Sequence, residues 1–273
     1  MGIRAGNATA VTSGVFRVAA STHLAARDHY ELSIEAPEIA EAAQPGQFVV
    51  LRLPGDGGTR LRRPFGVAGT DKDGLRLVFK AVGKVTREMA GLKKGDKVDI
   101  VGPLGTAFPL GEPGRQRLLA GGGYGVAPLI FLADRLVGAN PEMQVKLVVG
   151  ARDAGSLMYL DRLKAEKRYQ AFLCTDDGSE GERGTAAALV MRKAAEEGGK
   201  ALVCACGPLP MLKALRPLFS SAECHVSVDA YMACGTGVCM GCVLPAPGGG
   251  YIRACREGPV LPSTAIDWDR LAL

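Results

Sequence analysis

Four cysteines in the C-terminal part of this 273-residue chain form its clearest chemical pattern. They follow the spacing C-x4-C-x2-C-x12-C: Cys234, Cys239, Cys242 and Cys255. The first three lie in a glycine-rich stretch, and glycine permits positive φ angles and a close approach of backbone N–H groups to sulfur. Three thiolates on one tight loop, with a fourth brought back by a hairpin, have the spacing of a 2Fe–2S cluster. We therefore expect a redox cluster here.

A structural zinc site is the main alternative for these cysteines. Such sites normally use two C-x2–4-C pairs, and here the second pair is missing because Cys255 stands alone. Disulfides are disfavoured, because eight cysteines in 273 residues are far fewer than a disulfide-stapled secreted scaffold carries. The other four lie in or beside apolar runs and are interpreted as small buried side chains: Cys174, Cys204, Cys206 and Cys224.

Composition indicates a globular protein, with 47% hydrophobic and 22% charged residues. The net charge of +5 is spread along the chain, which argues against a nucleic-acid partner. No apolar run approaches the roughly 20 residues that a membrane span needs, so no membrane association is expected. The first residues lack the apolar segment of a signal peptide, and with free thiols this predicts a cytoplasmic location.

Residues 1–112 are predicted to be all-β. Short runs that alternate apolar and polar residues are separated by turns rich in glycine, proline and aspartate. The expected strands are Val15–Val18, Tyr30–Ile34, Gln47–Leu53, Leu75–Phe79 and Lys97–Val101, with one short helix at Lys84–Gly91. Such strands are typical of a small antiparallel barrel or sandwich.

Residues 113–222 are predicted to form an α/β unit, because strands alternate with helices there. The expected strands are Arg117–Ala120, Val145–Val149, Ala171–Cys174 and Ala201–Ala205. The expected helices are Val126–Leu136, Ser156–Ala165, Thr185–Ala195 and Pro210–Phe219. This order indicates a parallel sheet with helices on both faces. Residues 223–273 would form a small cysteine-bearing subdomain with a hairpin turned at Gly248–Gly250.

Two turns in the α/β unit are candidate nucleotide-binding segments. Glycines at Gly121, Gly123 and Gly125 join the first expected strand to the first helix, where a backbone can approach a pyrophosphate. The usual third glycine of the dinucleotide fingerprint is Pro128, which the first helical turn tolerates. The second turn, Cys206-Gly207-Pro208, follows a later strand. Asp176 follows another strand, and could either hydrogen-bond a ribose or belong to a polar turn.

The β part has a further candidate in the segment from Arg60 to Val67. It places three arginines beside the aromatic Phe65. An arginine fork can clamp a pyrophosphate and an aromatic ring can lie against a flat ring, although arginines are also common at strand ends.

These motifs together resemble the ferredoxin–NADP reductase superfamily. The resemblance rests on Arg63-Pro64-Phe65-Gly66, on Gly123 to Pro128, and on Cys206-Gly207-Pro208. With the cysteine cluster, nearly the whole chain resembles the electron-transfer subunits of NAD-dependent dihydroorotate dehydrogenases. The resemblance implies an antiparallel β-barrel that binds FAD, an α/β parallel-sheet unit that binds NAD(H), and a C-terminal 2Fe–2S subdomain.

The resemblance also implies roles for individual residues. Arg63 would clamp the FAD pyrophosphate, Phe65 would lie near the isoalloxazine, and Cys206 would be the catalytic residue near the nicotinamide. The other implied flavin residues are Pro64, Gly66, Gly83 and Thr86, and the other implied NAD(H) residues are Gly121, Gly123, Gly125, Asp176, Gly207 and Pro208. Family members usually have Ser or Thr where this chain has Gly66, so the flavin would lose a hydroxyl there.

The implied activity is electron transfer in pyrimidine biosynthesis. A separate catalytic flavoprotein, an FMN-containing dihydroorotate dehydrogenase, would pass electrons through the 2Fe–2S cluster and FAD to NAD, in a hetero-tetramer. Candidate docking residues around the cluster are Tyr231, Met232, Val238, Met240 and Val243. The same residues could equally serve as local packing that keeps water from the cluster. One alternative is a reductase subunit that oxidises NAD(P)H for a sulfur reductase, a hydrogenase or another ferredoxin-type partner. The other is a non-enzymatic binding protein with structural zinc.

Overall fold

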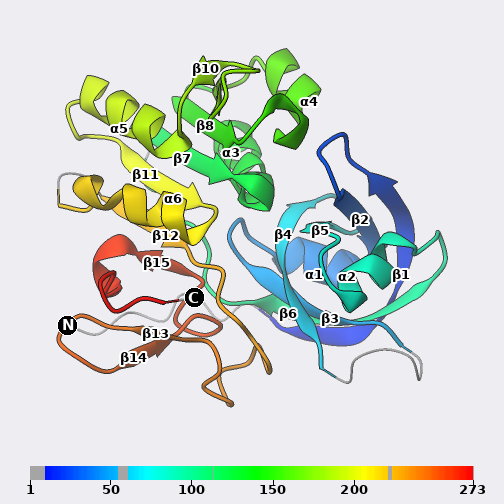
Figure 1. The fold of residues 1–273 in the computed structure, drawn as a ribbon. Coiled ribbons are helices and arrows are strands. Elements are labelled where there is room, and N and C mark those ends of the chain that lie inside the picture. Colours follow the sequence, from blue (N-terminus) through cyan, green and yellow to red (C-terminus); the bar gives the residue numbers. More distant parts are fainter. Residues whose placement is uncertain (1–9, 55–60, 113, 221–222, 273) are drawn as a thin grey trace.

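The computed structural model describes residues 10–54, 61–112, 114–220 and 223–272. A closed β-barrel lies beside a layered α/β unit, and the cysteine-bearing segment lies beyond the β15 edge of the α/β sheet (Figure 1). No helix in these residues is long and apolar enough to cross a membrane.

The barrel has six antiparallel strands in the order β1-β2-β5-β4-β3-β6, and pairing of β1 with β6 closes it. The strands are β1 (Thr12–His23), β2 (His29–Glu35), β3 (Phe48–Arg52), β4 (Arg63–Thr70), β5 (Leu75–Lys80) and β6 (Lys97–Leu104). Alternate side chains fill the interior, among them Leu32 and Ile34 of β2. Two short helices, α1 (Pro37–Ala42) and α2 (Lys84–Ala90), add Ile39 and Met89 to this core. Of the two predicted architectures, the barrel is therefore the correct one.

Strand β4 was not among the expected strands, although its residues were singled out for their chemistry. Its sequence contains one proline and two glycines, which weaken the strand signal. Pairing with β3 on one side and β5 on the other outweighs that low propensity. The candidate flavin residues from Arg63 to Gly66 thus lie on a barrel strand that is paired on both sides.

The α/β unit is built on a seven-stranded sheet with the order β10-β9-β8-β7-β11-β12-β15. Its strands are β7 (Arg117–Gly122), β8 (Val145–Ala151), β9 (Gln170–Thr175), β10 (Glu182–Arg183), β11 (Leu202–Cys206), β12 (Cys224–Ser227) and β15 (Val260–Pro262). All neighbours are parallel except β15, which is antiparallel to β12. The sheet continues past residue 222, where the sequence analysis ended the α/β unit, because β12 and β15 complete its edge.

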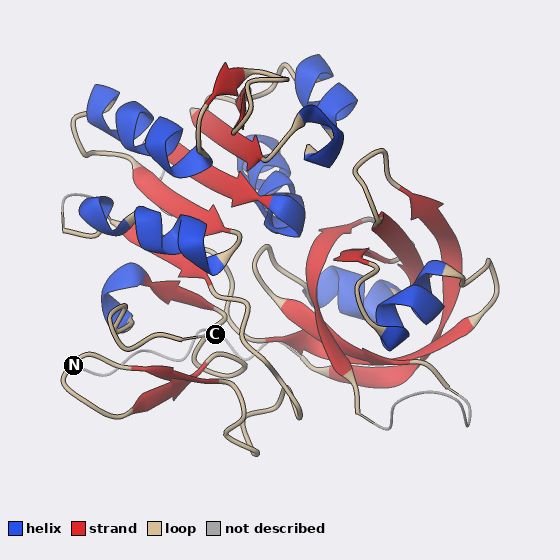
Figure 2. Ribbon diagram, in the orientation of Figure 1, coloured by secondary structure: helices blue, strands red, loops and turns tan. Residues whose placement is uncertain are grey.

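Helices cover both faces of the sheet, as expected (Figure 2). The cluster on one face includes α3 (Val126–Ala139) and α4 (Leu160–Ala165), and the other includes α5 (Ala186–Glu196) and α6 (Leu209–Ala214). Neighbouring residues of β7 point to opposite faces, so Leu118 packs in one cluster and Leu119 in the other.

Two helices are shorter than predicted. The segment expected to be helical from Ser156 forms a 3-10 turn at Ala154–Ser156, and α4 begins only at Leu160 because Tyr159 has a φ of 56°. The helix expected at 210–219 ends at Ala214, and a 3-10 turn follows at Arg216–Leu218. Pro217 lacks an N–H group and cannot continue an α-helical ladder.

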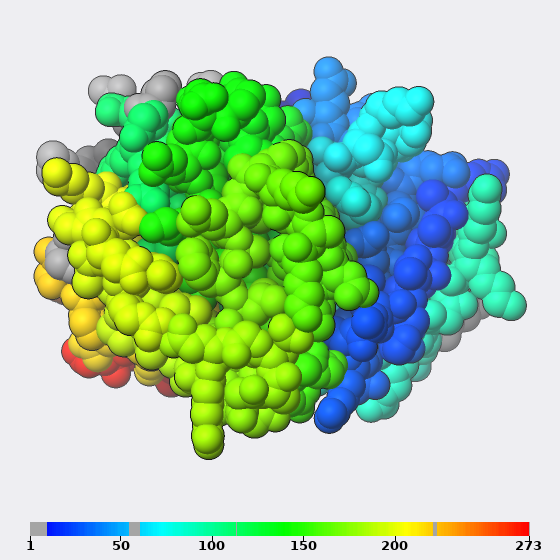
Figure 3. All heavy atoms as spheres, turned by 90° about the horizontal axis from the view of Figure 1, so that it is seen from above, coloured from blue at the N-terminus to red at the C-terminus, as the bar shows by residue number. Residues whose placement is uncertain are grey.

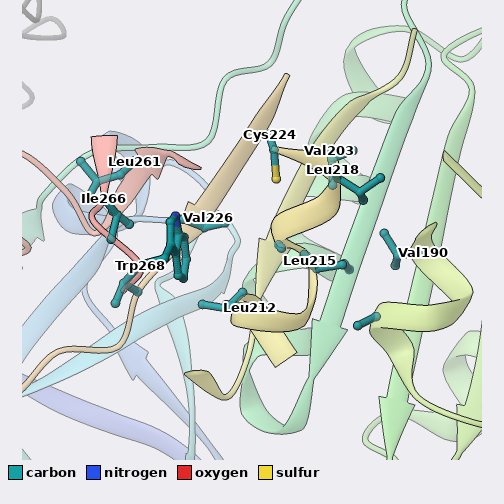
Figure 4. Packing of buried hydrophobic residues seen from close by; sticks show 14 of the residues in the cluster. Val190, Val203, Leu212, Leu215, Leu218, Cys224, Val226, Leu261, Ile266 and Trp268 are labelled. Atoms are coloured by element: carbon teal, nitrogen blue, oxygen red, sulfur yellow. The ribbon is translucent and has the colours of Figure 1, made fainter. Parts of the chain in front are cut away.

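The C-terminal segment packs on the edge of the sheet through Trp268. The indole lies in a cluster with Val226, Leu261 and Ile266 (Figure 4). Its Nε1 donates a 2.8 Å hydrogen bond to the Ser263 carbonyl, and its ring lies 5.0 Å from that of Phe219. A short hairpin, β13 (Val243–Pro245) and β14 (Tyr251–Arg253), projects from this region. This packing fixes the segments that carry the cysteines.

Candidate functional site

The first three cysteines lie on a tight loop whose backbone amides point at sulfur. The N–H groups of Thr236 and Cys239 donate to Cys234 Sγ at 3.4 and 3.5 Å. Gly241 N donates to Cys239 Sγ at 3.4 Å. Such N–H···S contacts stabilise thiolates and orient them as metal ligands.

The fourth cysteine meets the third across the hairpin. Cys255 N donates to Cys242 Sγ at 3.4 Å, and both side chains are buried, whereas Cys239 is exposed. No group of three or more His, Cys, Asp or Glu residues among the described residues is arranged to hold a single metal ion. A 2Fe–2S cluster instead distributes four thiolates over two irons, so its ligands lie farther apart.

The electrostatics of the loop fit thiolate ligands. Burial acts to raise the pKa of Cys234, but the amides of Cys239 and Thr236 outweigh it and lower that pKa to about 5. Burial, followed by the nearby Cys242, raises the pKa of Cys255 to about 12. A bound metal ion would offset the repulsion between the Cys242 and Cys255 thiolates, so that both could lose their protons on binding it.

The cysteine loop packs directly on the barrel. A Cβ atom at Gly235, where φ is +70°, would lie 2.5 Å from Val50 Cγ1 and 3.7 Å from the ring of Phe48. Only glycine permits this close approach. The loop therefore lies next to strand β3.

The two candidate nucleotide turns meet in the structure. Strands β7 and β11 are neighbours, and Gly121 pairs with Cys206 at their carboxyl ends. A Cβ atom at Gly125 would lie 2.5 Å from the Cys206 carbonyl oxygen and 2.8 Å from Gly207 N. Gly123 has a φ of +56°. The glycines thus allow the turns to pack together at the edge where parallel α/β sheets bind ligands.

A cavity of about 190 Å³ lies where the barrel, these turns and the cysteine-bearing segment meet. The barrel contributes Gly46, Phe48, Pro64, Gly66 and Val78. The α/β turns contribute Gly122, Gly123, Tyr124, Gly125, Ala127, Pro128, Cys206, Gly207 and Pro208. The remaining wall consists of Ser227, Val228, Asp229, Met232 and Pro259. Most of the predicted nucleotide residues therefore face the barrel residues predicted for the flavin.

Cys206 lines this cavity as a neutral thiol. Burial raises its pKa to about 12, although a hydrogen bond with Ser227 acts in the opposite direction. Ser227 is its register partner on β12. A protonated thiol at the end of β11 can pack against a ring or donate a weak hydrogen bond.

Sequence reasoning missed a hydrogen bond across the cavity between Tyr124 and Asp229. The Tyr124 hydroxyl donates to Asp229 Oδ2. Burial, and then the Asp229 charge, hold the pKa of Tyr124 above its usual value, so the hydroxyl remains a donor. The bond joins the glycine-rich turn to the segment that leads into the cysteine loop. The residues are far apart in the chain, and no local pattern links them.

The candidate flavin residues between Arg60 and Gly66 have different surroundings in the structure. Pro64 and Gly66 face the cavity, whereas Phe65 points the other way into the barrel core, with its ring 6.0 Å from Phe79. Arg62 donates to Asp99 at 2.7 and 2.9 Å and so has a structural partner. Arg63 donates only weakly, at 3.3 Å, to backbone carbonyls. Arg60, named with them, lies outside the described residues.

Two other predicted regions lie away from the cavity lining. The Thr86 hydroxyl caps α2 by accepting hydrogen bonds from Val82 N and Gly83 N at 3.0 and 2.9 Å. Asp176 follows β9 and donates its N–H to the Ala151 carbonyl at 3.1 Å. Because β9 and β7 are parallel strands of one sheet, Asp176 lies at the same edge as the glycine-rich turn.

Comparison with known proteins agrees with this geometry. Residues 119–217 match the model of an oxidoreductase NAD-binding domain. Residues 229–267 match that of the iron–sulfur cluster binding domain of dihydroorotate dehydrogenase B.

Solved structures with the same fold include a chain of an NADH-dependent reduced ferredoxin–NADP oxidoreductase studied for flavin-based electron bifurcation. It is 30% identical with a TM-score of 0.82, over 95% of this chain and 92% of that one. A ferredoxin–NADP⁺ reductase from Neisseria gonorrhoeae with bound FAD and NADP shares the fold at 18% identity and a TM-score of 0.61. That match covers 76% of this chain and 90% of the other.

Similar proteins align with nearly the full length of this chain. The dihydroorotate dehydrogenase B (NAD⁺) electron-transfer subunit of Desulforamulus reducens is 37% identical over 256 residues, 91% of this chain and 96% of the relative. The corresponding subunit of Bacillus caldolyticus is 36% identical over 88% of this chain and 93% of the relative. The chain is an oxidoreductase subunit and belongs to the family of dihydroorotate dehydrogenase B electron-transfer subunits.

Proposed function

We propose that this chain passes electrons between a dihydroorotate-oxidising flavoprotein and NAD in pyrimidine biosynthesis. The observation that carries the proposal is the position of the cavity between the three parts of the chain. Met232 lines the cavity and lies two positions before Cys234. Phe48 lines it too and lies 3.7 Å from the Cβ position of Gly235 in the cysteine loop. The proposed nucleotide, flavin and cluster sites are therefore contiguous.

The residues that would hold each group come from different parts of the fold. FAD would be held by Arg63, Pro64, Gly66, Gly83 and Thr86, and Phe65 would support this part of β4 from within the barrel core. NAD(H) would be held by Gly121, Gly123, Gly125, Asp176, Gly207 and Pro208, with the Cys206 thiol at the reacting ring. The 2Fe–2S cluster would be ligated by Cys234, Cys239, Cys242 and Cys255. FAD and the cluster, when bound, supply the exchange between two-electron hydride chemistry and single-electron transfer.

The chain's own groups would position these reactants. Gly122 to Gly125 keep the backbone open for a pyrophosphate, and Pro64 and Gly66 shape the opposite wall. The apolar cavity excludes water from the reacting ring.

The chain would divide into three units. Residues 1–112 would bind the flavin, residues 113–222 would bind NAD, and residues 223–273 would bind the cluster. Strands β12 and β15 of the cluster unit also complete the sheet of the NAD unit.

The partner would be a catalytic FMN-containing flavoprotein in a hetero-tetramer in the cytoplasm. Its docking surface would lie around the exposed Cys239. Tyr231 and Val238 are each 81% exposed and Met240 is 51% exposed, whereas Met232 and Val243 are half-buried. Exposed apolar side chains around a redox site are typical of an interface. The eight cysteines, all within the described residues, are free, which suits a reducing compartment.

A second candidate function comes from the structural neighbour of the bifurcating type. Its 30% identity over 95% of this chain supports a reductase subunit that exchanges electrons between NAD(P)H and another flavoprotein or ferredoxin. Co-purification of the native complex from its source would separate the two. Recovery of a dihydroorotate-oxidising subunit supports the first, and recovery of a sulfur reductase, hydrogenase or second NADP(H)-linked flavoprotein supports the second.

The direct test is a visible spectrum of anaerobically purified protein, with flavin, iron, sulfide and zinc analysis, before and after NADH. We expect flavin and about two irons and two sulfides per chain, bleached by NADH. Zinc without flavin, and no bleaching, would contradict the proposal and favour a binding protein with structural zinc.

A further inference from the structure

Arg253 connects the two halves of the cysteine site. It ends strand β14 and lies two positions before Cys255. Its Nη1 donates a 2.8 Å hydrogen bond to the carbonyl oxygen of Gly237, in the loop that bears the first three cysteines. A single side chain therefore joins the hairpin end of the site to the loop.

Glu257 holds the Arg253 guanidinium in this position. Glu257 Oε2 accepts from Arg253 Nε at 3.1 Å and from the Arg253 backbone N at 2.8 Å, and Oε1 accepts from Nη2. The Glu257 N–H in turn donates to the Arg253 carbonyl at 3.0 Å. Both side chains are less than one-third exposed. A bidentate contact of this kind fixes the orientation of the guanidinium, and a lysine side chain cannot reproduce it.

The loop lies close to these side chains at Gly237. With a φ of +86°, a Cβ atom there would lie 2.9 Å from Arg256 Cδ and 3.5 Å from Arg253 Nη1. Arg253 pairs across the hairpin with Val243, the residue after Cys242, and the neighbouring Ala254 N–H donates to the Cys242 carbonyl at 3.0 Å. The guanidinium therefore belongs to the same short hairpin as the proposed ligands Cys242 and Cys255.

We propose that Arg253 and Glu257 are a positioning pair for the cluster. Arg253 holds the cysteine loop against the hairpin and places a positive charge beside Cys242 and Cys255, and Glu257 orients and partly offsets that charge. This inference rests on the proposed function, because it presupposes the cluster. A positive charge favours the reduced, more negative cluster, and a negative charge opposes it.

The test is a potentiometric titration of the full chain, with the reduced cluster followed by electron paramagnetic resonance. Arg253→Gln should lower the midpoint potential and Glu257→Gln should raise it. Arg253→Lys keeps the charge but loses the fork, so its potential should stay nearer to that of the wild type while iron per chain falls. Shifts of opposite sign would not arise from a general loosening of the loop.

The matched controls are Arg192→Gln and Glu182→Gln. These residues form another arginine–glutamate pair, between α5 and β10, and β10 is the sheet edge opposite β15. The controls should leave the midpoint potential of the cluster unchanged.

The inference would be overturned if Arg253→Gln and Glu257→Gln left the potential unshifted, or shifted it in the same direction. If Arg253→Gln retains no cluster, Glu257→Gln decides by the presence or absence of its upward shift. A wild-type protein without a cluster signal would instead contradict the proposed function.

Discussion

The Tyr159 hydroxyl donates a 2.5 Å hydrogen bond to a carboxylate oxygen of Glu31, across the seam between the α/β unit and the barrel. The two units meet along this seam in the space-filling view (Figure 3). Burial, followed by the Glu31 charge, raises the pKa of Tyr159 above its usual value, so the hydroxyl stays a donor. Val78 and Ala127 belong to a buried cluster packed against Tyr159, and both line the cavity. The seam contacts therefore help to set the distance between the cavity walls.

We expect Tyr159→Phe to destabilise the protein by about 1–3 kcal/mol, because it leaves the Glu31 carboxylate without a charged hydrogen bond. The measurement is the free energy of unfolding from urea denaturation. Tyr251→Phe is the control, since Tyr251 is 61% exposed, and it should change stability by less than about 0.5 kcal/mol. Equal stabilities for the two variants would show that the Tyr159–Glu31 bond does not hold the seam.

The chemistry of the site was largely predictable because it depends on local patterns. The cysteine spacing, the glycine-rich turn and the Cys206 turn each lie in a short continuous segment. Alternation of strands and helices then indicated that both turns lie at the carboxyl edge of one sheet. It did not indicate that their strands are neighbours, which the pairing of Gly121 with Cys206 shows. The closed barrel followed from regularly spaced short strands together with the family resemblance.

Some features of the structure could not be read from any regular pattern in the sequence, even where the residues involved are close in the chain. In the sequence, Arg117 is an ordinary charged residue at the start of a strand. In the structure it is fully buried, and its guanidinium donates to the carbonyls of Leu110, Glu112 and Arg115. Its partners lie in an irregular linker that has no periodicity to interpret. The family resemblance placed Phe65 near the flavin, but alternation of side chains along β4 directs its ring into the barrel core.

Glycines at the cavity should differ sharply in their tolerance of a side chain. A Cβ atom at Gly125 would lie 2.5 Å from the Cys206 carbonyl oxygen, whereas one at Gly66 meets nothing within 4 Å. We therefore expect Gly125→Ala to raise the KM for NADH about tenfold or more, since a backbone shift of the turn misplaces the nucleotide. Gly66→Ala should leave that KM near wild type.

The assay for this pair is NADH-dependent reduction of a dye, with flavin content measured in both variants. Gly66→Ser serves as an additional variant because it places a hydroxyl on the cavity wall, where a Cβ atom has open space. We expect it to fold normally and to change the rate of dye reduction. An unchanged KM in Gly125→Ala would argue against the glycine-rich turn as the nucleotide site.

The Cys206 thiol should not titrate in the neutral range. Its pKa is raised to about 12 by burial, so the folded protein keeps the proton through pH 7–9, and loses it only as pH rises toward that value. The pH profile of NADH-to-dye activity should therefore be flat in this range with respect to Cys206. Cys206→Ser, which also carries a neutral O–H, should have a profile of the same shape at a lower rate. An inflection near pH 8 that disappears in Cys206→Ser would contradict this prediction.

Met240 tests the docking surface separately from the internal electron path. It is 51% exposed on the cysteine loop, one position after Cys239, and its φ of 59° points to a fixed turn. Met240→Glu should lower partner-dependent turnover on the order of tenfold, because an uncompensated charge would be buried in the complex. NADH-to-dye activity should remain intact, since the cavity is unchanged.

The matched control is Val15→Glu, at an apolar barrel residue that is 61% exposed, and it should alter neither activity. Coupled turnover at the wild-type level in Met240→Glu would exclude a docking role for that residue.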